Sequence, residues 1–138
     1  MTAPLIDLTD WTIAFDLDGT LIETAPDLVG ALNTVLGEQG LKPIAYDEAR
    51  VMVGHGAKVM IERGYAATGL PLSAETSPAL VARFIEIYRA RIAQESRPFP
   101  GCLEALAALK AVGATLVVAT NKRTDLAVAL LDALDMSR

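Results

Sequence analysis

The chain has 138 residues, of which 52% are hydrophobic and 21% charged, and its formal net charge is −5. This length suits one domain by size, and the balance of residue types is that of a folded globular protein. The negative charge argues against nucleic acid and against an anionic membrane surface as partners. Cys102 is the only cysteine, so the sequence predicts no disulfide framework.

Neither a secretion signal nor a membrane span is evident in the sequence. Residues 1–10 lack a basic start followed by a long apolar segment, and no apolar run approaches the roughly 18 residues that a span needs. We therefore expect a cytoplasmic protein, and the sequence leaves its oligomeric state open.

An apolar run over residues 13–15 is typical of a buried parallel strand, and it ends in Asp16-Leu17-Asp18-Gly19-Thr20. Because side chains alternate along a strand, Asp16 and Asp18 point the same way where the chain leaves the sheet. Ligands of open α/β sheets bind at the carboxyl ends of the strands. Two neighbouring carboxylates repel unless a cation or a proton lies between them, and oxygen ligands suit Mg²⁺. The pattern indicates metal-assisted phosphate chemistry, although Asp-Gly alone is also a common turn.

The remaining elements are predicted from the spacing of apolar residues and from the positions of glycine and proline. Helices are expected over residues 26–36, 46–53, 57–68, 75–93, 103–112 and 124–134, a linker over 97–101, and a second buried strand over 114–119.

The two predicted strands are separated by far more chain than a parallel crossover requires, which is about a dozen residues with one helix. The helix expected over 103–112 is sufficient for that crossover. We therefore predict an α/β protein in which residues 1–22 and 98–138 form a Rossmann-like parallel-sheet core. Residues 23–97 are predicted to form an inserted, all-helical cap.

A second candidate site follows the second predicted strand, at Thr120-Asn121-Lys122. A hydroxyl group followed by free backbone N–H groups at the start of a helix can bind an anion, but the same residues also form ordinary caps and turns. Lys122 fits either a phosphate-attracting role or a solvated position. His55, the sole histidine, lies between two glycines in the predicted cap, where it either contacts substrate or is an exposed loop side chain.

The stretch from Phe15 to Leu21 resembles the first motif of the haloacid dehalogenase-like phosphohydrolases, and Thr120-Asn121-Lys122 is similar to their second motif. Residues 23–28 resemble the phosphoglycolate phosphatase branch. The resemblance implies that Asp16 is the nucleophile, that Asp18 is the general acid/base, and that both hold Mg²⁺. It further implies the following binding residues: Thr120, Asn121 and Lys122 for phosphate, and His55 of the cap for substrate selection.

The implied activity is Mg²⁺-dependent hydrolysis of a small phosphorylated metabolite, 2-phosphoglycolate first among them, through an aspartyl-phosphate. Dehalogenases lack an acid at the position of Asp18 and the related ion-pumping ATPases carry threonine there, so Asp18 favours a hydrolase or mutase. The alternatives are another capped member (a sugar-phosphate phosphatase, a pyrophosphatase or a β-phosphoglucomutase-like enzyme) and an inactive phosphate- and Mg²⁺-binding fragment.

The resemblance also implies a third motif, a lysine, and a fourth, an acidic pair, and both would lie beyond Arg138. We therefore expect the sequence to be C-terminally truncated, and the 138-residue chain by itself to be inactive.

Overall fold

The structure is a computed structural model that describes residues 6–137. Its strands are β1 (Thr12–Phe15), β2 (Ile22–Glu23), β3 (Arg97–Pro98) and β4 (Thr115–Val118). Its helices are α1 (Ala25–Glu38), α2 (Tyr46–Ala49), the 3₁₀ helix η1 (Arg50–Met52), α3 (Ala57–Ala67), α4 (Ser77–Ala90), α5 (Cys102–Ala111) and α6 (Thr124–Ala133).

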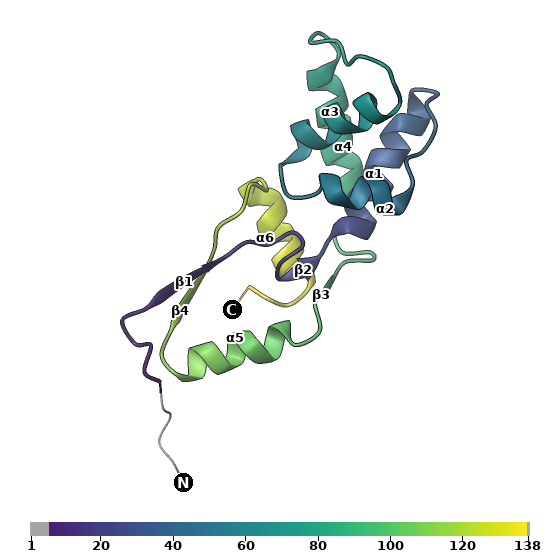
Figure 1. Ribbon diagram of the computed structural model, residues 1–138. Helices are drawn as coiled ribbons and strands as arrows, with labels where there is room; N and C mark the ends of the chain where they lie inside the picture. Colours follow the sequence, from purple (N-terminus) through teal and green to yellow (C-terminus); the bar gives the residue numbers. More distant parts are fainter. Residues whose placement is uncertain (1–5, 138) are drawn as a thin grey trace.

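The parallel pair that the sequence predicts is present, with β1 beside β4 and Thr12 opposite Thr115 through Phe15 opposite Val118. Helix α5 provides the crossover between the two strands, and α6 follows β4 (Figure 1). A hydrophobic cluster with the fully buried Leu17 and Leu130 joins the turn after β1 to α6. This arrangement confirms the α/β class and the parallel partial core.

Helices α1 to α4, which come between β2 and β3 in the chain, gather as a separate helical body (Figure 1). Their own hydrophobic cluster includes the fully buried Leu32 and Ile61 together with Phe84. Gly64 of α3 allows that helix to approach α1 closely, because a Cβ at this position would lie 2.7 Å from Cδ1 of Leu32. The cap therefore has a core of its own; its boundaries at residues 23 and 97 remain a prediction.

The expected linker over 97–101 begins with a strand that the sequence analysis missed. Arg97 and Pro98 of β3 pair with Glu23 and Ile22 of β2 in an antiparallel ladder. A two-residue strand is too short to show an alternating pattern, so the sequence carries no signal for it. The ladder brings together the two segments of chain that lead into and out of the cap.

Two predicted helices have different limits in the structure. The helix expected over 46–53 ends as α2 at Ala49 and continues as η1 to Met52, and the chain then passes through Gly54 and Gly56 with φ angles of 106° and 87°. The helix expected over 75–93 is α4, which starts at Ser77 because proline in its first turn favours a helix start there.

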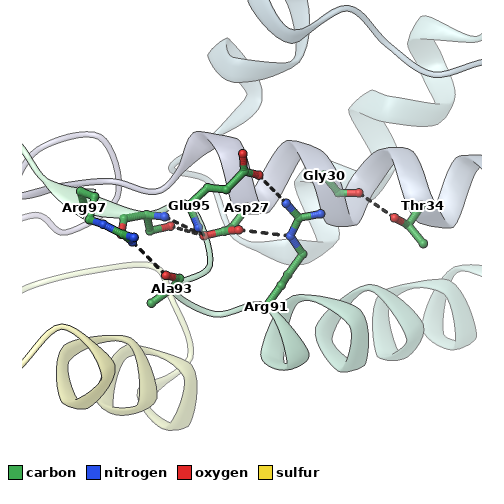
Figure 2. Close-up of polar contacts among 8 residues, drawn as sticks. Asp27, Gly30, Thr34, Arg91, Ala93, Glu95 and Arg97 are labelled. Atoms are coloured by element: carbon green, nitrogen blue, oxygen red, sulfur yellow. Dashed lines mark hydrogen bonds and ion pairs between the residues drawn. The ribbon is translucent and has the colours of Figure 1, made fainter.

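A buried carboxylate lies at the base of the cap. Asp27, in the first turn of α1, is fully buried, and its Oδ2 accepts hydrogen bonds from the backbone N–H groups of Glu95 and Ser96 at 2.9 and 2.8 Å and from the Ser96 hydroxyl at 2.7 Å. Its Oδ1 accepts a bond from Nε of Arg91 at 3.1 Å (Figure 2). Through these hydrogen bonds Asp27 connects the start of α1 to residues 95–96, which follow α4.

Candidate active site

Asp16 and Thr120 leave neighbouring strands at the same edge of the sheet. The ladder of β1 and β4 ends with Phe15 opposite Val118, and the N–H of Ala119 donates to the carbonyl oxygen of Phe15 at 2.8 Å. The next residue on each strand is therefore at the carboxyl end, where ligands of parallel sheets bind. The structure thus brings the first and second candidate motifs together.

Asp16 carries an exposed carboxylate. Its Oδ1 accepts a hydrogen bond from the backbone N–H of Leu17 at 2.8 Å. No side chain among residues 6–137 is hydrogen-bonded to this carboxylate. The Leu17 bond orients the carboxylate and leaves Oδ2 open to solvent or to a ligand.

Asp18 is enclosed, with 8% of its side chain exposed. Its Oδ1 accepts a hydrogen bond from the hydroxyl of the fully buried Thr24 at 2.7 Å, and the ammonium of Lys122 lies 2.8 Å from the same oxygen. Thr24 precedes α1 and Lys122 follows β4, so one carboxylate oxygen joins the cap entrance to the second motif. In the part of the chain that the structure describes, Oδ2 of Asp18 has no hydrogen-bond donor.

The side chain of Lys122 is buried beside Asp18, so the solvated alternative for this side chain is wrong, and its role toward phosphate remains a prediction. Its side chain is 5% exposed, and besides Asp18 it donates to the hydroxyl oxygen of Tyr88 at 2.8 Å. Burial lowers the pKa of Lys122, and the charge and hydrogen bond of Asp18 oppose that effect. Burial also raises the pKa of Tyr88, with a further contribution from Asp18 and Asp27, so the Tyr88 hydroxyl keeps its proton.

The other two residues of the second motif differ in their contacts. The hydroxyl oxygen of Thr120 accepts a hydrogen bond from the backbone N–H of Lys122 at 3.1 Å, so its own hydrogen can be donated to a ligand. The side-chain amide of Asn121 donates to the carbonyl oxygen of Gly54 in the cap at 3.0 Å. Asn121 therefore contacts the loop that holds His55.

His55 has an exposed side chain. The two glycines that flank it, Gly54 and Gly56, line a cavity between the cap and the core, but His55 itself does not. The structure places the loop at the site and the imidazole at its outer side, and the role of His55 in selecting substrate remains a prediction.

That cavity is small, about 60 Å³, and most of its wall is apolar. Cap residues Leu28, Met52, Met60 and Phe84 line it together with Leu126 of α6. Its polar wall includes Asp18, Tyr88 and Lys122, whereas Asp16 and Thr120 do not line it. The cavity therefore extends from Asp18 toward the cap, away from the exposed nucleophile candidate.

A further polar contact joins cap and core beside the cavity. Arg89 of α4 forms an ion pair with Asp125 of α6, which is also held by Arg123 at 3.0 Å. The hydrogen bond from Arg89, followed by that from Arg123, lowers the pKa of Asp125. Next along α6, Leu126 is 3% exposed and belongs to the hydrophobic cluster of the cap. Residues 121–126 thus form the strip of the core that the cap contacts.

Two features are absent from residues 6–137. No group of three or more histidine, cysteine, aspartate or glutamate side chains is arranged to hold a metal ion. None of the described helices combines the length and apolar character that crossing a lipid bilayer requires.

Comparison with known proteins identifies the class that this fold and site define. The sequence profile of haloacid dehalogenase-like hydrolases matches residues 13–138, so the chain belongs to that family.

Its relatives include the phosphoglycolate phosphatase of Caulobacter vibrioides, which is 61% identical over 133 residues, or 96% of this chain and 56% of that protein. The phosphoglycolate phosphatase of Agrobacterium fabrum is 48% identical over 90% of this chain and 53% of its own length. The crystal structure of a predicted phosphoglycolate phosphatase from Haemophilus somnus superposes with a TM-score of 0.84 at 29% identity and covers 95% of this chain and 60% of that one. The chain spans about half the length of the curated relatives it matches.

Sequence reasoning missed three residues of this region. They are Thr24, Asp27 and Tyr88, to which the sequence patterns assign no contact or role. All three are almost completely buried. Only Tyr88 gives a signal in the sequence, because it is a polar residue at an apolar position of a helix. A buried polar group of this kind requires a hydrogen-bond partner.

Proposed function

We propose that the protein hydrolyses a small phosphomonoester, 2-phosphoglycolate first among them, through an aspartyl-phosphate on Asp16. The observation that carries the proposal is the pair of carboxylates at the end of β1, one exposed and one enclosed beside Lys122 and the cap cavity. The names of the Caulobacter and Agrobacterium relatives support the choice of substrate.

Asp16 is the proposed nucleophile. The Leu17 N–H fixes its Oδ1, and its exposed Oδ2 is available to attack phosphorus in line with the leaving oxygen. The bond from phosphorus to the leaving oxygen breaks as the bond to Asp16 forms, and water then releases phosphate from the intermediate.

Asp18 is the proposed general acid and base. Two donors, Thr24 and Lys122, hold Oδ1, and the orientation they impose leaves Oδ2 to carry the proton. In the first step Asp18 gives a proton to the leaving alkoxide, and in the second it removes a proton from the attacking water. The enclosed position of Asp18 beside the cavity supports this role, since the leaving group has to lie next to the proton donor.

The phosphoryl group is proposed to lie against Thr120 and the backbone that follows it. Charge on its three oxygens requires donors that are already in position. Thr120 has a hydroxyl hydrogen to donate, and the backbone N–H of Asn121 follows in the same turn, whereas the N–H of Lys122 is bonded to Thr120. Lys122 supplies a cationic charge near the reacting group as well.

The family implies Mg²⁺, and the residues at the end of β1 fit that ion. Mg²⁺ in phosphate-binding sites is commonly held by one or two carboxylates, with waters and substrate phosphate completing its shell. Asp16 would hold the ion through its carboxylate and Asp18 through its backbone carbonyl oxygen, which leaves the Asp18 carboxylate for proton transfer. The cation would offset the negative charge of Asp16 and of the phosphate.

The remaining proposals concern selection, partners and setting. His55 is proposed to influence substrate choice from the edge of the cap loop. The proposed partner is a small phosphorylated metabolite, with no role for nucleic acid or membrane, in a cytoplasmic setting. Other capped activities of the family and a non-catalytic phosphate- and Mg²⁺-binding role remain the alternatives.

A phosphate-release assay tests the proposal on the complete gene product that contains this sequence. The assay compares 2-phosphoglycolate with sugar phosphates and pyrophosphate, with Mg²⁺ and with chelator. We expect Mg²⁺-dependent release that is fastest from 2-phosphoglycolate. Faster release from a sugar phosphate would favour another capped activity, and binding without release would favour the non-catalytic alternative.

A further inference from the structure

Tyr88 brings a phenolic hydroxyl from cap helix α4 to the enclosed end of the site, a role that no motif assigns to it. We propose that Tyr88 is a substrate-binding residue whose hydroxyl donates a hydrogen bond to a carboxylate on the leaving group of a small phosphomonoester. This inference rests on the proposed function and names the substrate class that the same site selects.

One hydrogen-bond donor at the buried end of the cavity lacks an acceptor among residues 6–137. The Tyr88 oxygen accepts a hydrogen bond from Nζ of Lys122 at 2.8 Å, so the tyrosine's own hydrogen has to point elsewhere. Within residues 6–137 that hydrogen has no acceptor, and Tyr88 is 1% exposed. Lys122 uses two of its three N–H groups on Asp18 and Tyr88. A buried donor without an acceptor is costly, which indicates that a ligand supplies one.

The residues that line the cavity indicate which part of a ligand would enter it. Asp18, Tyr88 and Lys122 line the cavity, and Asp16 and Thr120 do not. The cavity therefore lies beside Asp18 and next to the turn that is proposed to hold the phosphoryl group, since Asn121 and Lys122 also line it. A group that is bonded to the phosphoryl oxygen and enters this cavity is the leaving group.

The size and the lining of the cavity restrict the chemistry of its occupant. A cavity of about 60 Å³ admits only a few heavy atoms, and its apolar walls, such as Met60 and Phe84, offer no partners to a polyhydroxylated sugar. The donors Tyr88 and Lys122 lie together at one place on the wall and favour an anionic acceptor. A short leaving group that ends in a carboxylate satisfies both requirements.

The test compares two substrates of similar size on the complete gene product. 2-Phosphoglycolate carries the carboxylate, and ethyl phosphate lacks it. The variant is Tyr88→Phe, which keeps the ring and removes the hydroxyl. Tyr65→Phe is the matched control, because Tyr65 is a buried tyrosine of cap helix α3 that does not line the cavity.

A lost hydrogen bond to a charged group predicts that Tyr88→Phe lowers kcat/KM for 2-phosphoglycolate by about tenfold to a hundredfold. The loss should be carried mainly by KM, and kcat/KM for ethyl phosphate should change by less than about threefold. Tyr65→Phe should leave both values near those of the unaltered protein. Equal losses on both substrates, or no loss on either, would overturn the inference.

A binding arm separates this inference from the proposed function. Titration calorimetry with 2-phosphoglycolate in an Asp16→Asn background, which should bind without turnover, should give a Kd with Tyr88→Phe about tenfold or more above that without it or with Tyr65→Phe. If phosphate release is absent while this difference persists, the hydrolase proposal fails and the Tyr88 assignment stands. If release occurs and the Kd values agree, the Tyr88 assignment fails alone.

Discussion

The ammonium of Lys122 lies 2.8 Å from Oδ1 of Asp18, and 5% and 8% of the two side chains are exposed. This ion pair links the two sequence motifs, because Asp18 follows β1 and Lys122 follows β4. Thr24 and Tyr88 complete its surroundings from the cap side. The geometry of this ion pair therefore depends on the packing of the cap against the core.

Breaking this pair should destabilise the protein. Lys122→Met leaves the enclosed carboxylate of Asp18 without its cation, and we expect a loss of about 3 kcal/mol in the free energy of unfolding. Lys58→Met is the control, because the Lys58 side chain is 74% exposed and its partner is 3.9 Å away; its effect should stay below about 0.5 kcal/mol. Chemical denaturation measures both, and equal midpoints for the two variants would contradict the prediction.

Two glycines of α1 provide a matched test of the Asp27 cluster. A Cβ at Gly30 would lie 2.2 Å from Nη1 of Arg91, so alanine there has to displace the guanidinium that bonds to Asp27. At Gly37 a Cβ meets nothing within 4 Å. We expect Gly30→Ala to cost about 1–2 kcal/mol through the lost charged hydrogen bond, and Gly37→Ala to stabilise by up to about 1 kcal/mol through helix propensity. Thermal or chemical unfolding measures both variants. If both substitutions raise the free energy of unfolding, Arg91 can be displaced without an energetic cost, which would contradict the prediction.

The ion pair between Arg89 and Asp125 predicts a pH dependence. Because the hydrogen bond from Arg89 lowers the pKa of Asp125 below its ordinary value of 3.8, its contribution to stability is fully present above that value. The contribution is lost as the pH falls through the lowered pKa of the folded state. We expect the stability difference between the unaltered protein and Asp125→Asn to be largest at neutral pH and to vanish in strong acid.

Chemical denaturation of both proteins across the acidic range measures this difference, and added salt should reduce it at neutral pH because the pair is exposed to solvent. A difference that does not change with pH would mean that the pair contributes no charge interaction.

The exposed His55 gives a prediction on selectivity. If its imidazole contacts the part of the substrate that enters past the cap loop, His55→Ala should change the ranking of phosphomonoesters by kcat/KM. It should leave hydrolysis of a generic aryl phosphate close to normal. A uniform loss on every substrate would assign His55 to folding or to the chemistry instead.

The parts of the fold that the sequence predicts correctly are those with local signals. The run at residues 13–15 and the two aspartates after it predict a strand end with paired carboxylates, and the structure contains them. The apolar spacing of the helices locates each of them to within a few residues. Helix limits differ where a local contact decides them, as Ser77 shows with proline in the first turn of α4.

The parts that the sequence does not predict depend on distant partners. Asp27 has the appearance of a first-turn aspartate, yet its hydrogen-bond partners lie 64 to 69 residues further along the chain. Tyr88 has helical spacing with Phe84, and only the packing of the cap against the core brings its hydroxyl oxygen to within 2.8 Å of Nζ of Lys122. Such contacts form only in the tertiary structure and produce no periodic pattern in the sequence.

The central claim is that Asp16 becomes phosphorylated during turnover, and the most direct measurement is mass spectrometry of the complete gene product quenched in acid during reaction with 2-phosphoglycolate. The account predicts one added phosphoryl group on the peptide that contains Asp16, and it predicts that Asp16→Asn lacks both the adduct and turnover. Asp18→Asn should still form the adduct, but at a rate lower by about 10²- to 10⁴-fold, the usual loss for a missing general acid or base. Near-normal turnover by Asp16→Asn, or an adduct on a different residue, would contradict the account.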